Sequence, residues 1–222
     1  PNFNNPLGGC IPDARKKELV ELLTSHNIPL IEDDIYGELY FGKNRPRTCK
    51  YYDREGIVMH CSSFSKSLAP GYRIGWVLPG RYMEEVKQLK RILSISSPGL
   101  TQAAVAHYLQ HGRFEYHLKN LRTCLHAQMQ RYMQGIVEHL PDDTKVSRPQ
   151  GGVVLWVELN KKVDSFRLRT EAMKQHISIM PGKIFSASCN YTNCIRVSFG
   201  KPWDDHAEHG LQVLGRLIRK MI

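Results

Sequence analysis

One polar segment, residues 61–76 (CSSFSKSLAPGYRIGW), constrains the fold of this chain more than any other part of the sequence. It follows a short apolar run, residues 57–60, that is typical of a buried strand. A second predicted strand, residues 72–78, begins around Arg73 after a Pro-Gly turn. The sequence therefore predicts two strands joined by a polar segment that contains Lys66.

The polar segment combines groups that suit a phosphate ester carrying an aldehyde. The hydroxyls of Ser63 and Ser65 and the guanidinium of Arg73 can bind a phosphate group beside the end of a strand. The amine of Lys66, partly shielded from water among them, can be neutral enough to attack a carbonyl. A phosphate site next to an amine nucleophile is what pyridoxal 5'-phosphate (PLP) requires.

Other interpretations of Lys66 stay open at this point. A lone lysine after a strand is most often a solvated surface residue. Residues 63–66 also form S-x-x-K, the nucleophile motif of penicillin-binding proteins and class A β-lactamases, but the companion motifs S-D-N and K-T-G are absent from the sequence. A Walker A phosphate loop is excluded because no Gly-x4-Gly precedes Lys66.

Charge and cysteine content exclude several classes of protein. The formal net charge is +10, from 31 Lys and Arg against 21 Asp and Glu, and the basic residues are scattered. Such a charge favours anions non-specifically and does not by itself predict nucleic-acid binding. The 6 cysteines form no CxxC pair and the 10 histidines form no HExxH pair, so we expect reduced thiols and no metal.

Two further features concern location and length. The sequence has no apolar run long enough to span a bilayer and no signal-peptide pattern, so we expect a cytoplasmic protein without membrane contact. It begins with Pro1 rather than methionine, within what looks like a motif. We therefore expect these residues to be part of a longer protein.

Three consecutive acids, residues 32–34, follow a short apolar run at the carboxyl end of a predicted strand. Ligands of open α/β sheets bind at these strand ends. Acids at such a place most often cap the next element or face solvent. Next to a pyridine ring, however, the carboxylate of Asp33 would keep the ring nitrogen protonated. Tyr36 follows Asp33 closely enough to point into the same cleft if the turn is tight.

Asn5 and Arg196 are polar residues in restrictive local settings. Pro6 limits Asn5 to extended backbone conformations, and the Asn5 amide can both donate and accept hydrogen bonds, although Asn-Pro is most often simply a turn. Arg196 is the basic residue within an apolar run, residues 195–199. It therefore either pairs with a buried acid or binds a ligand anion.

The order of predicted elements indicates an α/β part followed by an α+β part. A long helix over residues 113–140, which contains no proline, is expected to link two lobes. We therefore predict three parts, residues 1–112, 113–140 and 141–222. The predicted helices are 12–26, 84–95, 101–109, 113–140, 165–176 and 204–221, and the predicted strands are 29–31, 57–60, 72–78, 151–159, 177–180 and 195–199.

Taken together, these stretches resemble fold-type I PLP-dependent aminotransferases of class I/II. Four longer segments resemble the aminotransferase-like domain of MocR-type regulators of the GntR family. They are residues 32–39, 64–76, 151–158 and 180–187. Bacterial and archaeal aminotransferases of the aminoadipate and aromatic type share much of the sequence of these segments. The motifs that carry the resemblance are Asn5-Pro6-x-Gly8, Asp33-x-x-Tyr36, Ser63-x-Ser65-Lys66 followed by Arg73, and Ile195-Arg196-Val-Ser-Phe199.

The resemblance implies a fold and a set of site residues. The fold is α/β: part of the mostly parallel large domain of an aspartate aminotransferase-like transferase, followed by a C-terminal α+β small domain. Lys66 would carry PLP as an internal aldimine and, in an enzyme, move a proton between the substrate Cα and C4′. Asp33 would pair with the pyridinium nitrogen, and Tyr36 and Asn5 would hydrogen-bond the phenolic oxygen. Ser63, Ser65 and Arg73 would bind the phosphate. Arg196, assisted by Asn5, would bind an amino-acid carboxylate with two hydrogen bonds.

Two functions fit this resemblance. The first is a transcriptional regulator that binds PLP and an amino-acid-like effector, with DNA bound by a winged helix that would precede residue 1. The second is an aminotransferase that exchanges amino groups between amino acids and 2-oxo acids. We favour the regulator because the longer segments resemble MocR-type regulators. A degenerate fold without cofactor is disfavoured because Lys66, Asp33 and Arg73 are all present. The family implies a homodimer and an earlier half of the domain, and the sequence does not identify the substrate or effector.

Overall fold

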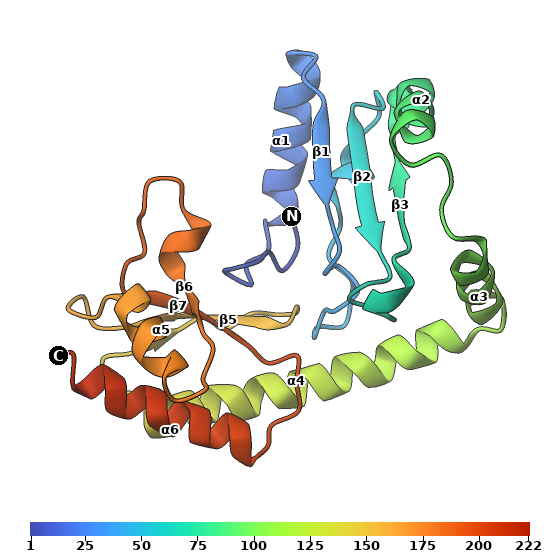
Figure 1. The fold of residues 1–222 in the computed structure, drawn as a ribbon. Coiled ribbons are helices and arrows are strands. Elements are labelled where there is room, and N and C mark those ends of the chain that lie inside the picture. Colours follow the sequence, from blue (N-terminus) through green and yellow to red (C-terminus); the bar gives the residue numbers. More distant parts are fainter. The chain divides into compact units, whose positions relative to one another are not determined.

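A computed structural model describes all residues 1–222 (Figure 1). The chain divides into two compact units. The first comprises Pro1–Phe3 and Cys10–Arg122, and the second comprises Asn4–Gly9 and Thr123–Ile222. The boundary falls within the long helix α4 (Arg113–His139). The division into three parts expected from the sequence stays a prediction.

The first unit is an α/β layer built on a mixed sheet in the order β1-β2-β3. Strand β1 runs parallel to β2, and β3 runs antiparallel to β2. Figure 1 shows the three strands side by side, with α1 next to β1. The elements are α1 (Asp13–Ser25), β1 (Leu30–Asp33), β2 (Val58–Ser63), β3 (Gly75–Leu78), α2 (Met83–Ser94) and α3 (Gly99–Gln110), with short 3-10 helices η1 (Cys49–Tyr52), η2 (Pro70–Tyr72) and η3 (Gly80–Tyr82).

Helix α1 packs on this sheet through a small apolar core. Val20 of α1 belongs to a cluster with Cys49, Ile57 and Val58, in which every side chain is buried. Leu30 of β1 packs against the same cluster. Leu30 and Val58 are partners in the strand register, so their side chains lie on one face of the sheet, and α1 covers that face.

The second unit is an α+β arrangement around an antiparallel sheet in the order β4-β5-β7-β6. Helices α5 and α6 pack against each other in this unit. The elements are β4 (Lys145–Val146), β5 (Val154–Glu158), α5 (Ser165–Met173), β6 (Met180–Pro181), the 3-10 helix η4 (Gly182–Phe185), β7 (Cys194–Ser198) and α6 (Asp205–Arg219).

Two glycines allow close contacts around α4. A Cβ on Gly135 of α4 would overlap the ring of Trp203, and a Cβ on Gly215 of α6 would overlap the carbonyl oxygen of His139. The Trp203 ring also makes an edge-to-face contact with Tyr132 at 5.0 Å. The glycine within α4 therefore provides room for a tryptophan, and this packing outweighs the cost of glycine in a helix.

The helices expected from the sequence all form, whereas several strands differ. Strand β2 continues to Ser63, past the predicted end at residue 60, because β1 and β3 pair with it on both sides. Strand β3 begins only after Arg73, whose φ of 55° is left-handed and breaks the strand. The predicted strand 177–180 is wrong except at its last residue, because β6 covers only Met180–Pro181 and its pairing with β7 begins at Met180, opposite Arg196.

Two observations bear on membranes and metals. No helix in the structure combines the length and apolar character needed to cross a bilayer. The structure also contains no group of three or more His, Cys, Asp or Glu side chains arranged to hold a metal ion.

Candidate functional site

The predicted site residues of the first unit lie at the carboxyl ends of β1 and β2. These strands are parallel, so their ends meet at one edge of the sheet. Asp33, the last residue of β1, lies opposite Cys61, and Ser63 ends β2 on the same face as Cys61. Burial, followed by the negative charge of Asp33, raises the pKa of the Cys61 thiol. The residue beside Asp33 is therefore a neutral thiol.

The structure distinguishes the three consecutive acids by burial. Asp33 is exposed, whereas Glu32 is 4% and Asp34 1% exposed. Glu32 points to the opposite face of β1 and accepts hydrogen bonds from two backbone N–H groups of η1 at 2.7 and 2.8 Å. It also pairs with Nδ1 of His60 at 3.0 Å. Glu32 is therefore structural, and Asp33 is the acid that a ligand can reach.

Asp34 anchors the turn that follows β1. Its carboxylate accepts hydrogen bonds from Asn2 Nδ2 at 2.8 Å and from Arg45 Nη2 at 2.6 Å. Arg45 also donates through Nε to Glu38 at 2.7 Å, at the far end of the turn. Because both ends of the turn are tied to one guanidinium, the backbone that carries Tyr36 is held firmly next to Asp33.

The loop after β2 is fixed by contacts with α4. Phe64 is 9% exposed, and its ring packs against Trp76 at 4.8 Å and Phe114 of α4 at 5.7 Å between centroids. One turn further along α4, Nε2 of His117 lies 2.9 Å from the carbonyl oxygen of Ser67. The loop is thus held on both sides of its lysine by an aromatic contact and a hydrogen bond.

The lysine loop offers a donor set that fits PLP. Lys66 is exposed, and its amine has no hydrogen-bond or ion-pair partner. Arg73 makes only a long contact of 3.4 Å to a backbone carbonyl. Ser63 Oγ accepts a long hydrogen bond of 3.3 Å from the Ser65 N–H, and the hydroxyl of Ser67 is buried without a partner. Free cationic and hydroxyl donors without an acid in the loop suit a phosphate-bearing aldehyde.

In the second unit the structure brings Arg196 and Asn5 together. Arg196 donates through Nη1 to Asn5 Oδ1 at 2.9 Å. Its guanidinium lies over the ring of Phe185 at 5.4 Å, and its Nε is buried without a partner. No acidic side chain pairs with Arg196, so of the two roles that the sequence left open, the binding of a ligand anion is favoured.

Asn5 is held by a tight turn at the start of the chain. The N–H of Asn4 donates to the carbonyl oxygen of Gly9 at 2.9 Å, and the N–H of Gly8 donates to that of Asn4 at 2.6 Å. Gly8 has a φ of 69°, and a Cβ there would lie 2.9 Å from Cβ of Pro149. A glycine is therefore required at this position of the Asn-Pro-x-Gly motif, both for its backbone conformation and for the close contact.

The predicted site residues thus form two sets, one in each unit. Sequence reasoning missed the residues that hold the first set, namely Asn2, Arg45 and His117, because each acts on a partner distant in the chain. The available signal was weak, because Arg45 is one of three arginines in an irregular stretch, residues 40–54. The first set is Asp33, Tyr36, Ser63, Ser65, Lys66 and Arg73, and the second is Asn5 and Arg196.

Glu32 makes the stability of the first unit depend on pH. Burial raises the pKa of its carboxyl, but hydrogen bonds from His60 and two backbone N–H groups outweigh burial, so the pKa lies below its usual value of 4.5. A carboxyl group whose pKa is lowered by folding stabilises the folded state at pH values above its unfolded-state pKa. This contribution is lost as the pH falls through the folded-state pKa.

We therefore expect Glu32→Gln to lower the free energy of unfolding at neutral pH, and the gap to wild type to close as the pH falls below about 4.5. Urea unfolding at a series of pH values measures this gap. Glu18→Gln, on the exposed side of α1, is the matched control and should show little difference at any pH. A Glu32→Gln gap that stays constant with pH would contradict the assignment.

The fold and the two residue sets together define an aminotransferase-like α/β protein. A family model described as "Aminotransferase class I and II" matches residues 1–214. The chain belongs to this family. The predicted resemblance and fold class are thereby confirmed.

Several relatives have defined names or structures. The chain is 39% identical over 221 residues to the uncharacterized HTH-type transcriptional regulator YdcR of Escherichia coli (strain K12), covering 100% of this chain and 47% of YdcR. The kynurenine aminotransferase of Pyrococcus horikoshii, solved with PMP, matches with a TM-score of 0.92 and 29% identity, over 99% of this chain and 55% of that chain. The α-aminoadipate aminotransferase LysN of Thermus thermophilus, complexed with N-(5'-phosphopyridoxyl)-L-leucine, matches with a TM-score of 0.92 and 28% identity, over 100% and 58%. The chain thus spans about half the length of these relatives.

Proposed function

We propose that the chain is a PLP-binding, aminotransferase-like domain of a MocR-type transcriptional regulator of the GntR family. One observation carries the proposal: the unpaired amine of Lys66 lies on a loop with the free donors of Ser65 and Arg73, next to the strand end that exposes Asp33. This combination of an amine, anion-binding donors and a nearby carboxylate matches the functional groups of PLP.

Each residue of the first unit has a role in this proposal. The amine of Lys66 binds the cofactor aldehyde covalently. Asp33 holds a proton on the pyridine nitrogen, and Tyr36 donates to the phenolic oxygen. Ser63, Ser65 and Arg73 bind the phosphate. When bound, PLP supplies a ring that withdraws electrons from the amino-acid Cα.

In the second unit, Arg196 binds the carboxylate of an amino-acid-like effector. A planar guanidinium recognises a carboxylate with two parallel hydrogen bonds, and the Nε–H of Arg196 has no hydrogen-bond partner within the protein. Asn5 already accepts a hydrogen bond from Nη1 and so orients the guanidinium. Asn5 also contributes a hydrogen bond to the phenolic oxygen of the cofactor.

The regulator is favoured over an enzyme because the chain is 39% identical to an HTH-type transcriptional regulator, compared with 28–29% for the two aminotransferase structures. In this proposal DNA is bound by a winged-helix part of the whole protein, and the protein is a homodimer. The alternative is a class I/II aminotransferase in which the amine of Lys66 also moves the α-proton of the substrate. The resemblance to working aminotransferases supports that alternative.

Reduction with borohydride tests the shared part of both functions. The whole protein is incubated with PLP, reduced, digested and analysed by mass spectrometry. We expect a phosphopyridoxyl group on Lys66, and far less labelling when pyridoxal replaces PLP, because pyridoxal lacks the phosphate bound by Ser63, Ser65 and Arg73. No adduct on Lys66 would overturn the proposal. Release of 2-oxo acid from a panel of amino acids by the loaded protein would then favour the enzyme over the regulator.

A further inference from the structure

The second unit contains a groove in which Arg196 is the only lining residue that has a role in the proposed function. It has a volume of about 760 Å³, within the range of small-molecule sites, and lies between the start of α6 and the segment that precedes β6. We call it the basic groove. Its rim includes His176, Ser178, Ser198, Lys201 and His206.

The groove exists because the sheet opens at its edge. Met180 and Arg196 are paired in the register, but no backbone hydrogen bond continues the pairing to Ser178 and Ser198. Where the two segments separate, apolar side chains of the core form the floor. These are Tyr132, Ile179, Leu211 and Leu214, all buried.

The rim carries basic side chains that have no partner within the protein. Lys201, His176 and His206 form no hydrogen bond or ion pair through their side chains. The acid at the rim is Asp204, and its carboxylate caps α6 by accepting a hydrogen bond from the N–H of Ala207 at 2.8 Å. An unpaired lysine and two imidazoles above an apolar floor complement an anion with an apolar body.

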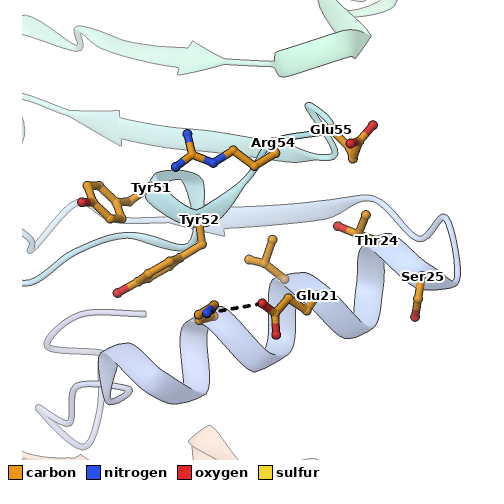
Figure 2. A pocket seen from close by; sticks show the side chains of 9 residues that line it. Glu21, Thr24, Ser25, Tyr51, Tyr52, Arg54 and Glu55 are labelled. Carbon is orange, nitrogen blue, oxygen red and sulfur yellow. Dashed lines mark ion pairs between the residues drawn. The ribbon is translucent and has the colours of Figure 1, made fainter.

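A second pocket provides a useful contrast. It has a volume of about 440 Å³ and lies between α1 and η1, where Tyr51, Tyr52 and Arg54 line it (Figure 2). Two acidic and two basic residues line it, and Glu21 forms an ion pair with Lys17 at 3.7 Å. This pocket therefore has no excess of one charge that would select a ligand.

We propose that the basic groove binds a small organic anion, a carboxylate or phosphate group attached to a short apolar body. Lys201 holds the anionic group, and the floor around Leu211 holds the apolar body. Arg196 also borders the groove, but its Nη1 donates to Asn5 and the proposal assigns the anionic group to Lys201, so it does not depend on the role of Arg196 in the proposed function.

Isothermal titration of the whole protein with four probes tests the proposal: hexanoate, hexyl phosphate, hexan-1-ol and inorganic phosphate. We expect at least one of the two amphiphilic anions to bind at least about tenfold more tightly than both the alcohol and inorganic phosphate. The tighter of hexanoate and hexyl phosphate identifies the anionic group. Equal binding of hexan-1-ol, tight binding of inorganic phosphate alone, or no binding of either anion would overturn the proposal.

Two variants locate the binding. Lys201→Met keeps most of the length of the side chain and removes its charge, and we expect it to weaken binding of the preferred anion about tenfold. Lys161→Met, at another exposed lysine of the same unit that does not line the groove, is the matched control and should leave the affinity unchanged. If Arg196→Lys abolished binding while Lys201→Met had no effect, the anion would be bound by the proposed effector residue instead, and the groove would be rejected.

Discussion

Replacing Lys66 with arginine is expected to abolish covalent attachment of PLP to the protein. Arginine keeps the positive charge, but its guanidinium is not nucleophilic at neutral pH and forms no imine. The structure gives Lys66 no other task, because its side chain is exposed and its amine is unpaired. The variant should therefore fold normally and lose the phosphopyridoxyl label completely after borohydride reduction.

The control for this prediction is another lysine. Lys87 lies on α2, is exposed and pairs with Glu84 at 2.8 Å, so Lys87→Arg should retain the full label at Lys66. Circular dichroism of both variants confirms that the fold is intact. A Lys66→Arg protein that still carried one label per chain, on a different lysine, would show that Lys66 is not the attachment point.

The parts of the site that depend on local spacing could be predicted from the sequence. Lys66 and Asp33 follow apolar runs that form β2 and β1, and parallel strands bring the residues after their carboxyl ends to one sheet edge. The same reasoning could also have distinguished the exposed Asp33 from the buried Glu32. Alternation along β1 places Glu32 on the other face, where it is buried.

The contacts that hold the site could not be predicted, because they join residues far apart in the chain. Nothing near Asp34 indicates that its partners are Asn2 and Arg45. Likewise, the opening of the sheet beside β6 depends on where pairing with β7 stops, whereas the β-branched residues around Ile177 favoured a longer strand. Local preference predicts an element, and tertiary contacts decide its length.

Lys16 is the most unusual of these distant contacts, because a lysine is almost never fully buried. Its side chain is 0% exposed, and Nζ donates to Asn2 Oδ1 at 2.8 Å and to the carbonyl oxygen of Arg47 at 2.6 Å. Asn2 in turn donates to Asp34, the residue that anchors the turn after Asp33. Lys16 is therefore linked through Asn2 to the strand end that exposes Asp33.

We expect Lys16→Met to reduce the free energy of unfolding by about 2–4 kcal/mol, because it removes the amine that donates to Asn2 Oδ1 and to the carbonyl oxygen of Arg47. These two buried oxygens keep only weaker donors, Cys10 Sγ at 3.1 Å and Asn2 Nδ2 at 3.3 Å. Urea unfolding of the whole protein measures this loss. Lys17→Met is the matched control one residue away: Lys17 is 61% exposed, its contact with Glu21 is 3.7 Å, and its loss should cost less than about 0.5 kcal/mol. Equal stabilities of the two variants would mean that water replaces the Lys16 amine, and that Asn2 does not need it to hold Asp34 in place.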